Sequence, residues 1–276
     1  MGDRGYRFLG RTHPAEHLFV IAGPCVIESE QMSLDVAGKL REICSRLGIG
    51  YVFKSSYRKD NRSSVESFVG PDAEKGLAIL SGVRREIKVP VLTDVHCRDE
   101  VAPAAAAVDV LQIPAFLCRQ TRLLQEAARA CGVVNVKKGQ FMAPDDMGRV
   151  LEKLEAARPG GEFWLTERGT TFGYRDLVVD MRGFAIMGDL ASTVVFDVTH
   201  SLQHPGAGGD RRFARTLARA AIAAGADGLF LETHPEPESA LSDPTTQLPL
   251  SSVASFLEEM LEWKRLCGRR ARMGEA

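Results

Sequence analysis

The feature of this sequence that most constrains its fold is a regular alternation of short apolar runs with longer amphipathic stretches. Several runs are almost continuous in Val, Ile, Leu and Phe, which is typical of strands buried on both faces of a parallel sheet. There are eight such runs, at residues 17–25, 51–56, 89–95, 110–115, 135–139, 163–168, 193–199 and 228–234.

The stretches between the runs place apolar residues three and four positions apart, as one face of a helix requires. They cover residues 31–47, 74–87, 119–130, 147–157, 211–224 and 251–267, and an alanine-rich segment lies at 102–107. Strand–helix alternation repeated eight times within 276 residues predicts an α/β fold, a single-domain (β/α)8 TIM barrel over about residues 17–267. An open doubly wound sheet is the alternative, but no G-x-G-x-x-G follows the first run. The short N-terminal extension is expected to plug the barrel floor.

Composition limits the partners of such a barrel. The net charge is −1, so no general field favours nucleic acid or an anionic membrane, and an anionic substrate must be held by local cations. No apolar run approaches the roughly 20 residues that span a bilayer, and the first residues lack the apolar centre of a secretory signal. The six cysteines form no CxxC pair, which favours reduced thiols. We therefore expect a cytoplasmic protein with neither a nucleic-acid nor a membrane partner.

Polar side chains gather where the apolar runs end. In a barrel, the groups that carry out chemistry lie just beyond the carboxyl ends of the strands. Three long polar loops, at 57–72, 169–190 and 235–250, also follow strands. The polar residues at the run ends are Cys25, Lys54, Ser56, Asp94, His96, Gln112, Lys137, Lys138, Glu167, Arg168, Asp197, His200, Glu232 and His234.

One subset of these residues has the chemistry of a metal site. Cys25, His200 and Glu232 end the first, seventh and eighth runs, which become neighbours when the barrel closes. Asp243, in the last long loop, can fold back as a fourth ligand. A thiolate, an imidazole and two carboxylates suit one divalent ion such as Zn²⁺, Fe²⁺ or Mn²⁺. The alternative is that Cys25 is a small buried hydrophobe and His200 a hydrogen-bonded core histidine.

A second subset is cationic. Lys137, Lys138 and Arg168 end the fifth and sixth runs, with Lys54 opposite, and their burial is unfavourable unless an anion meets them. The loop after the second run carries more cations and hydroxyls, and it is either a second phosphate site or a solvated basic loop. Its residues are Lys59, Arg62, Ser63 and Ser64. Two anion sites and a metal suggest two phosphorylated substrates joined by chemistry, whereas a non-catalytic sugar-phosphate-binding barrel is the alternative.

Eight ordered motifs then make the sequence similar to a known family, 3-deoxy-D-manno-octulosonate 8-phosphate (KDO 8-phosphate) synthase. They cover essentially the whole barrel. The motifs are Ile21-Ala-Gly-Pro-Cys25, Lys54-Ser-Ser56, Lys59-Asp-Asn-Arg-Ser-Ser64, Asn135-Val-Lys-Lys-Gly139, Thr166-Glu-Arg-Gly169, Phe172-Gly-Tyr174, Leu177-Val-Val-Asp-Met181 and Asp197-Val-Thr-His-Ser201.

The resemblance implies a reaction and an assembly. Phosphoenolpyruvate, D-arabinose 5-phosphate and water would give KDO 8-phosphate and phosphate, in lipopolysaccharide synthesis. Members of the family are usually homotetramers in which a neighbouring subunit lends part of each active site. The metal-dependent branch has cysteine after Gly-Pro, where Cys25 stands, and its other ligands match His200, Glu232 and Asp243.

The related 3-deoxy-D-arabino-heptulosonate 7-phosphate (DAHP) synthases share the barrel, the Gly-Pro-Cys motif and the metal ligands. Their second loop usually reads Lys/Arg-Pro-Arg-Thr/Ser, whereas this chain reads Asn-Arg-Ser-Ser from Asn61 and lacks the proline. The loop therefore favours arabinose 5-phosphate over erythrose 4-phosphate. Asp60 departs from the alanine common in the family, and we expect it to point outward, away from the phosphate.

The resemblance also implies roles for single residues. Lys138 and Arg168 would hold the phosphate of phosphoenolpyruvate, with Lys54 and Lys59 near its carboxylate and the aldehyde. Arg62 and Ser63 would hold the aldose phosphate, Asn61 an aldose hydroxyl, and Ser56 and Gln112 further substrate atoms. Gln112 and His96 could instead make structural hydrogen bonds, and Asp94 and Asp197 would orient their neighbours. The expected catalytic residues are Cys25, Lys54, Lys138 and His200.

Overall fold

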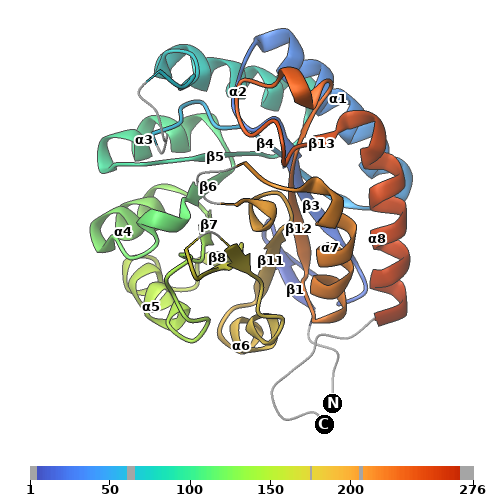
Figure 1. Ribbon diagram of the computed structural model, residues 1–276. Helices are drawn as coiled ribbons and strands as arrows, with labels where there is room; N and C mark the ends of the chain where they lie inside the picture. The colour runs from blue at the N-terminus through green and yellow to red at the C-terminus, as the bar shows by residue number, and fades with distance from the viewer. Residues whose placement is uncertain (1–4, 61–65, 175, 205–207, 268–276) are drawn as a thin grey trace.

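The computed structural model describes residues 5–60, 66–174, 176–204 and 208–267. Within them, eight parallel strands form a closed barrel, because β12 pairs with β11 on one side and with β3 on the other. Figure 1 looks into this ring of strands, with the helices around it. The barrel strands are β3 (Phe19–Gly23), β4 (Gly50–Lys54), β5 (Val91–Asp94), β6 (Val110–Ile113), β7 (Val133–Lys137), β8 (Glu162–Glu167), β11 (Thr193–Asp197) and β12 (Gly228–His234).

A helix follows each barrel strand and packs its apolar side on the barrel. In the first helix, Ser29 accepts a hydrogen bond from the Met32 amide, and Gly48 ends the helix with a φ of 68° that glycine adopts without strain. The helices are α1 (Glu30–Leu47), α2 (Ala73–Ile87), α3 (Arg98–Ala107), α4 (Thr121–Ala130), α5 (Met147–Ala157), α6 (Arg182–Leu190), α7 (Ala214–Ala223) and α8 (Val253–Cys267). Short 3-10 turns lie at Ala115–Leu117, His200–Leu202, Arg211–Phe213, Pro237–Ser239 and Leu250–Ser252.

The predicted TIM barrel is confirmed, and each of the eight apolar runs overlaps one barrel strand. The expected loop at 169–190 is wrong, because it contains β9 (Thr170–Phe172), β10 (Asp176–Val178) and α6. The two strands pair as a hairpin that is largely exposed, so no apolar alternation marks it. Helix α6 has only nine residues, too few to display a clear helical repeat.

The N-terminal extension closes the barrel floor, as expected. Strands β1 (Tyr6–Phe8) and β2 (Arg11–His13) form a hairpin whose aromatic side chains enter the core. The Phe8 ring lies 4.5 Å from the Phe19 ring and 5.7 Å from the Trp164 ring, measured between centroids. The Glu162 carboxylate accepts hydrogen bonds from the amides of Leu9 and Gly10, which fixes the turn of the hairpin.

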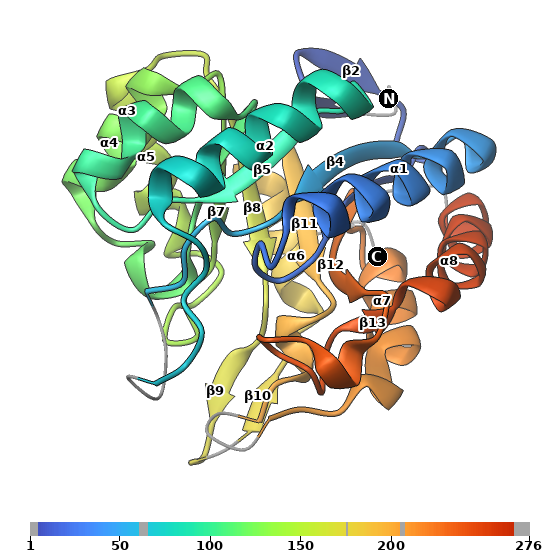
Figure 2. The same cartoon turned by 90° about the horizontal axis from the view of Figure 1, so that it is seen from above.

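The opposite end of the barrel is the mouth, defined here as the carboxyl ends of the barrel strands with the loops that follow them. Figure 2 shows the β9–β10 hairpin and β13 (Leu248–Pro249) at this end and the β1–β2 hairpin at the other. In the described residues, no helix combines the length and the hydrophobicity that crossing a bilayer needs.

Candidate active site

The mouth concentrates charged side chains that are almost completely buried. None of the following is more than 6% exposed: Lys54, Asp94, Lys137, Arg168, Asp197 and Glu232. Charged groups with so little water around them require partners of opposite charge or a bound ligand. The clustering predicted at the strand ends is therefore present.

Barrel closure brings the predicted metal ligands together. Cys25, Glu232 and Asp243 each offer a ligand atom, and these atoms all lie within 4.8 Å of one another. The pairing of β12 with β3, which sets Glu232 opposite Gly23, produces this proximity. His200 lies beside the group, with its Nε2 3.7 Å from Oε2 of Glu232. The structure thus contains a group of donors that could hold a metal ion.

The loop after β12 is shaped to return Asp243 to the mouth. Asp243 has a φ of 50°, in the left-handed region that aspartate tolerates better than most residues. Its carbonyl oxygen accepts from the amides of Thr246 and Gln247, which fixes this turn. Its Oδ2 lies 3.1 Å from the Sγ of Cys25 and accepts the hydroxyl of Ser242. Burial, followed by the charge of Glu232, raises the pKa of the Cys25 thiol.

Glu232 has one satisfied oxygen and one that lacks a donor. Its Oε1 accepts a hydrogen bond from Lys54, whose ammonium also donates to the carbonyl of Cys25. Its Oε2 is buried without a hydrogen-bond partner among the described residues. Burial alone would raise the pKa of Glu232, but Lys54 and His200 outweigh it and the pKa lies well below its ordinary value. A buried carboxylate oxygen without a hydrogen-bond donor fits a cation at this point.

Asp197 joins the histidine to a lysine. Its carboxylate accepts from the backbone amide of His200, and the His200 Nδ1 lies 2.9 Å from Oδ2. The same Oδ2 is 2.7 Å from the ammonium of Lys137. A carboxylate on Nδ1 leaves Nε2 directed toward Glu232, the arrangement that a metal-binding histidine requires.

The two consecutive lysines have different surroundings. Lys137 points into the barrel, where its ammonium lies 3.8 Å from the centre of the Phe230 ring. Its pKa is lowered, because burial outweighs the attraction of Asp197. Lys138 is fully buried, and its ammonium donates to the carbonyls of Gly139 and Met142 and to the Thr170 hydroxyl, with Glu167 at 3.5 Å. The Lys137 ammonium therefore points into the barrel, whereas the Lys138 ammonium is held by groups that follow β7 and β8.

The guanidinium of Arg168 is connected through one side chain to the group of possible metal ligands. Its Nη2 donates to Oε1 of Gln203 at 2.7 Å, and Nε2 of Gln203 donates to Oδ1 of Asp243 at 2.9 Å. No sequence pattern marked Gln203, because it lies in a loop outside both the apolar runs and the motifs.

A chain of hydrogen bonds joins the ends of successive strands below the charged groups. Asp94 accepts from Ser56 on one side and from the amide of Gln112 on the other. Asn135 donates to Oε1 of Gln112 at 2.8 Å and accepts from the Thr166 hydroxyl at 2.6 Å. Asn135 and Thr166 were not predicted as site residues. Each is a polar residue inside an apolar run, and this pattern could have identified them.

The loop after β4 is described only in part. Lys59 lies at its start, with its ammonium 4.0 Å from Oε1 of Glu232. Asp60 is exposed and pairs with Arg58 at 2.7 Å. That its carboxylate points away from the aldose phosphate stays a prediction. The predicted aldose-phosphate residues Asn61, Arg62 and Ser63, and Ser64 with them, lie outside the described residues.

His96 stands in a second group of possible metal ligands, with Asp60 and Glu100. Each member already has a partner, since Arg58 neutralises Asp60 and His96 hydrogen-bonds to Glu100. Burial by itself raises the pKa of Glu100, but hydrogen bonds from His96 and Tyr57 lower it to about 2. This satisfied group favours a structural hydrogen bond for His96.

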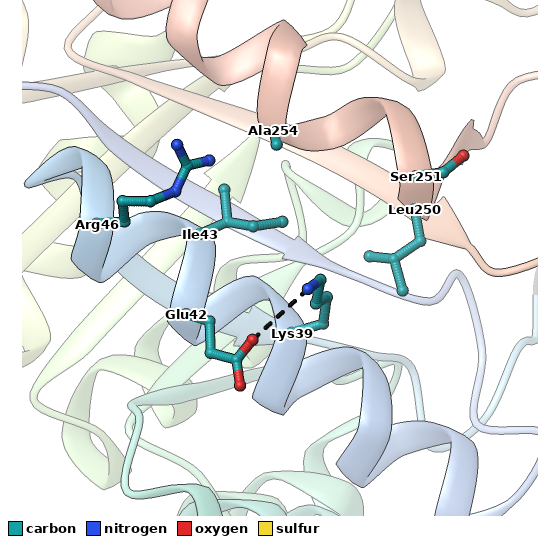
Figure 3. A pocket seen from close by; sticks show the side chains of 7 residues that line it. All are labelled: Lys39, Glu42, Ile43, Arg46, Leu250, Ser251 and Ala254. Atoms are coloured by element: carbon teal, nitrogen blue, oxygen red, sulfur yellow. Dashed lines mark ion pairs between the residues drawn. The ribbon is translucent and has the colours of Figure 1, made fainter.

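Figure 3 shows a pocket of about 270 Å³ on the outside of the barrel, between α1 and the start of α8. Its lysine and glutamate, Lys39 and Glu42, pair with each other at 3.6 Å and are both exposed. The pocket lacks the buried unpaired groups of the mouth, which remains the candidate active site.

Comparison with known proteins agrees with this site. Residues 12–268 match the model of the DAHP synthetase I family. A 2-dehydro-3-deoxyphosphooctonate aldolase of Paracidovorax citrulli is 54% identical over 253 residues, 88% of this chain and 89% of that protein. Proteins of the same name from Burkholderia mallei and Methylibium petroleiphilum are 52% and 53% identical, over 91% and 90% of this chain and 92% and 90% of their own.

That name denotes the enzyme that forms KDO 8-phosphate, so the resemblance drawn from the motifs is confirmed. The family model is named for the DAHP synthetases, but the similar proteins bear the phosphooctonate name. Over nine-tenths of its length, the chain therefore belongs to the 2-dehydro-3-deoxyphosphooctonate aldolases, the KDO 8-phosphate synthases, of the DAHP synthetase I family.

Proposed function

We propose that this chain, acting as one barrel domain, condenses phosphoenolpyruvate with D-arabinose 5-phosphate and water to give KDO 8-phosphate and phosphate. The enol carbon bonds to the aldehyde carbon, water adds to C2, and phosphate leaves with cleavage of its bond to C2. The observation that carries this proposal is the adjacency of buried cations and a thiol–carboxylate group at one barrel mouth. The names of the similar proteins support the substrates.

Lys137 and Arg168 are the groups best placed to hold the phosphate of phosphoenolpyruvate. Burial lowers the pKa of both, so a bound phosphate would offset an existing electrostatic cost. Arginine offers a bidentate fork to the phosphate and lysine a point charge. We assign to Lys137 the role that the family motif suggested for Lys138, because four protein groups already surround the ammonium of Lys138.

Lys54 and Lys59 flank the place where the reacting carbons would meet. Both ammonium groups face Oε1 of Glu232, so either can donate to the substrate carboxylate or to the aldehyde oxygen. Ser56 and Gln112 hold Asp94 and are proposed to border the substrate from below. Asn61, Arg62 and Ser63 follow Lys59 closely in the sequence and are proposed to bind the aldose hydroxyls and phosphate.

The donor set suits one divalent ion, Zn²⁺, Fe²⁺ or Mn²⁺, held by Cys25, His200, Glu232 and Asp243. The unsatisfied Oε2 of Glu232 and the closeness of sulfur and oxygen donors support this ligand set. A bound ion would supply Lewis acidity to the aldehyde oxygen or to a water molecule. Asp197 would keep His200 oriented, and Lys54 would keep Glu232 in place.

We further propose a homotetramer with active sites at subunit interfaces. The β9–β10 hairpin at the mouth exposes Phe172 at 69% and Tyr174 at 101%, and Phe141 and Phe116 are each 55% exposed. These side chains follow the neighbouring strands β6, β7 and β8, and large exposed apolar groups are typical of surfaces that another subunit covers. Sedimentation equilibrium of the full chain tests the assembly, and a monomer at assay concentration contradicts it.

A phosphate-release assay tests the reaction. The purified chain should release phosphate only when phosphoenolpyruvate and arabinose 5-phosphate are both present, and erythrose 4-phosphate should not replace the aldose. Release without an aldose, or none with both substrates, would refute the proposal and favour a simple sugar-phosphate-binding barrel.

Chelation tests the metal. Activity should disappear after dialysis against EDTA and return with Mn²⁺ or Zn²⁺, and Cys25→Ala should lower metal content. Cys97→Ser is the matched control, because this thiol is exposed and lies outside the donor group. Full activity of a protein shown by elemental analysis to be metal-free would contradict the proposed role.

A further inference from the structure

Gln203 occupies a position between the two halves of the proposed site. Its Oε1 accepts from the guanidinium of Arg168 at 2.7 Å, and its Nε2 donates to the carboxylate of Asp243 at 2.9 Å. Arg168 is proposed to bind the phosphate of phosphoenolpyruvate, and Asp243 to bind the metal. One side chain therefore touches a member of each half.

An amide is the group that can make both contacts at once. Its oxygen is an acceptor suited to the cation, and its nitrogen is a donor suited to the anion. A carboxylate here would neutralise Arg168 and repel Asp243. A direct ion pair between Arg168 and Asp243 would hold the guanidinium against the metal ligand and weaken its interaction with a substrate phosphate. The amide hydrogen-bonds to both Arg168 and Asp243 without neutralising the charge of either.

The backbone of Gln203 is fixed against the loop that carries Asp243. Gln203 forms a β-bridge with Gly209, and Gly209 packs on Thr246 so closely that a Cβ at Gly209 would lie 2.3 Å from its Cγ2. Thr246 in turn donates its amide to the carbonyl of Asp243. Displacement of Asp243 is thus transmitted to Gln203 through both side chain and backbone.

We propose that Gln203 is a positioning residue that couples the metal site to the phosphoenolpyruvate site, so that occupation of one tightens binding at the other. This inference rests on the proposed function. An ion on Asp243 fixes the carboxylate, which fixes the amide and then the guanidinium before substrate arrives. Thermodynamic linkage requires that phosphoenolpyruvate tighten the metal by the same factor. Asp197 connects His200 to Lys137 in a parallel way, so the two halves are joined twice.

The test is a binding cycle on the full chain with phosphoenolpyruvate alone, in which no turnover occurs. Isothermal titration gives the Kd of phosphoenolpyruvate without metal and with saturating Mn²⁺, and the ratio of the two values is the coupling factor. Couplings of this kind are typically about 5- to 150-fold. The direct attraction between the ion and the substrate is present in every variant. The test is therefore the change in coupling factor from the wild type to each variant.

Gln203→Met keeps the length and volume of the side chain and removes both hydrogen bonds. We expect its coupling factor to fall at least about threefold below that of the wild type. Gln31→Met is the matched control, because Gln31 on α1 is exposed and bonds only to Asp35 among the contacts described. Its coupling factor should equal that of the wild type. If Gln203→Met does not fold, Gln203→Asn, which is too short to reach both partners, replaces it.

An unchanged coupling factor in a folded Gln203 variant, or a wild-type factor near one, overturns the inference. Absence of Mn²⁺ binding to the wild type overturns it as well. Failure of the proposed function has a different signature, since the wild type would then release no phosphate with both substrates. If the wild type turns over normally and all variants have the same coupling factor, the role of Gln203 is rejected and the proposed function stands.

Discussion

Replacing Glu232 by glutamine tests the electrostatics of the mouth most directly. Glu232 is fully buried, and its Oε1 accepts a hydrogen bond from Lys54, which is 1% exposed. Glutamine keeps the volume of the side chain and removes its charge. Lys54 then retains the carbonyl of Cys25 as an acceptor but loses the anion beside it.

The expected loss of stability in EDTA-treated protein is large. Removing one member of a buried ion pair costs about 3–5 kcal/mol, because the remaining charge stays in a poorly solvated place. For a chain of 276 residues, that corresponds to a fall in Tm of roughly 5–9 °C. The pKa of Glu232 in the folded protein lies below its ordinary value, so its stabilisation is fully present at neutral pH. It is lost only as the pH falls through that lowered pKa.

Differential scanning calorimetry at neutral pH with EDTA measures the change. The double variant Lys54→Met, Glu232→Gln removes both charges and should be more stable than Glu232→Gln alone. Glu258→Gln is the matched control, since it breaks a pair with Arg46 whose side chains are 45% and 59% exposed. An exposed pair contributes roughly 0–1 kcal/mol. A Glu232→Gln protein as stable as the wild type, or a double variant that loses the sum of both single losses, would refute the reasoning.

Three further outcomes are expected. Phe8→Ala should cost about 3–5 kcal/mol in urea unfolding, because it empties the packed barrel floor, and should leave substrate affinity unchanged. Lys137→Met should weaken phosphoenolpyruvate binding roughly 10- to 100-fold in titration, as loss of a charge-assisted hydrogen bond implies. Lys138→Met should instead lower Tm and leave the affinity for phosphoenolpyruvate unchanged. The reverse pattern contradicts our assignment. Glu100→Gln should lower the urea midpoint by its full amount above pH 4.5. The difference from the wild type should shrink as the pH falls toward the folded-state pKa of Glu100, about 2. A difference in urea midpoint that does not depend on pH rejects this role.

Much of the site was readable from strand ends. Cys25, Glu232 and Asp243 were expected to meet, because the order of strands in a closed barrel makes the first and last strands neighbours. To decide which of Lys137 and Lys138 faces the inside of the barrel, the register of strand β7 must be known. Consecutive strand residues face opposite sides, and a shift of one residue exchanges them. The polar Asn135, two residues before Lys137, already indicated which lysine shares the inner face.

The sequence by itself determined the barrel and the chemical types of the side chains at its strand ends, because periodicity and strand-end position are local properties of the chain. The tertiary structure alone decided which groups are satisfied. Gln203 meets Arg168 and Asp243 across gaps of 35 and 40 residues, and the hairpin of β9 and β10 forms in what read as a loop. The contacts of Gln203 depend on the packing of loops against one another at the mouth, and no local pattern encodes them. The hairpin is local, but its exposure leaves it without an apolar alternation.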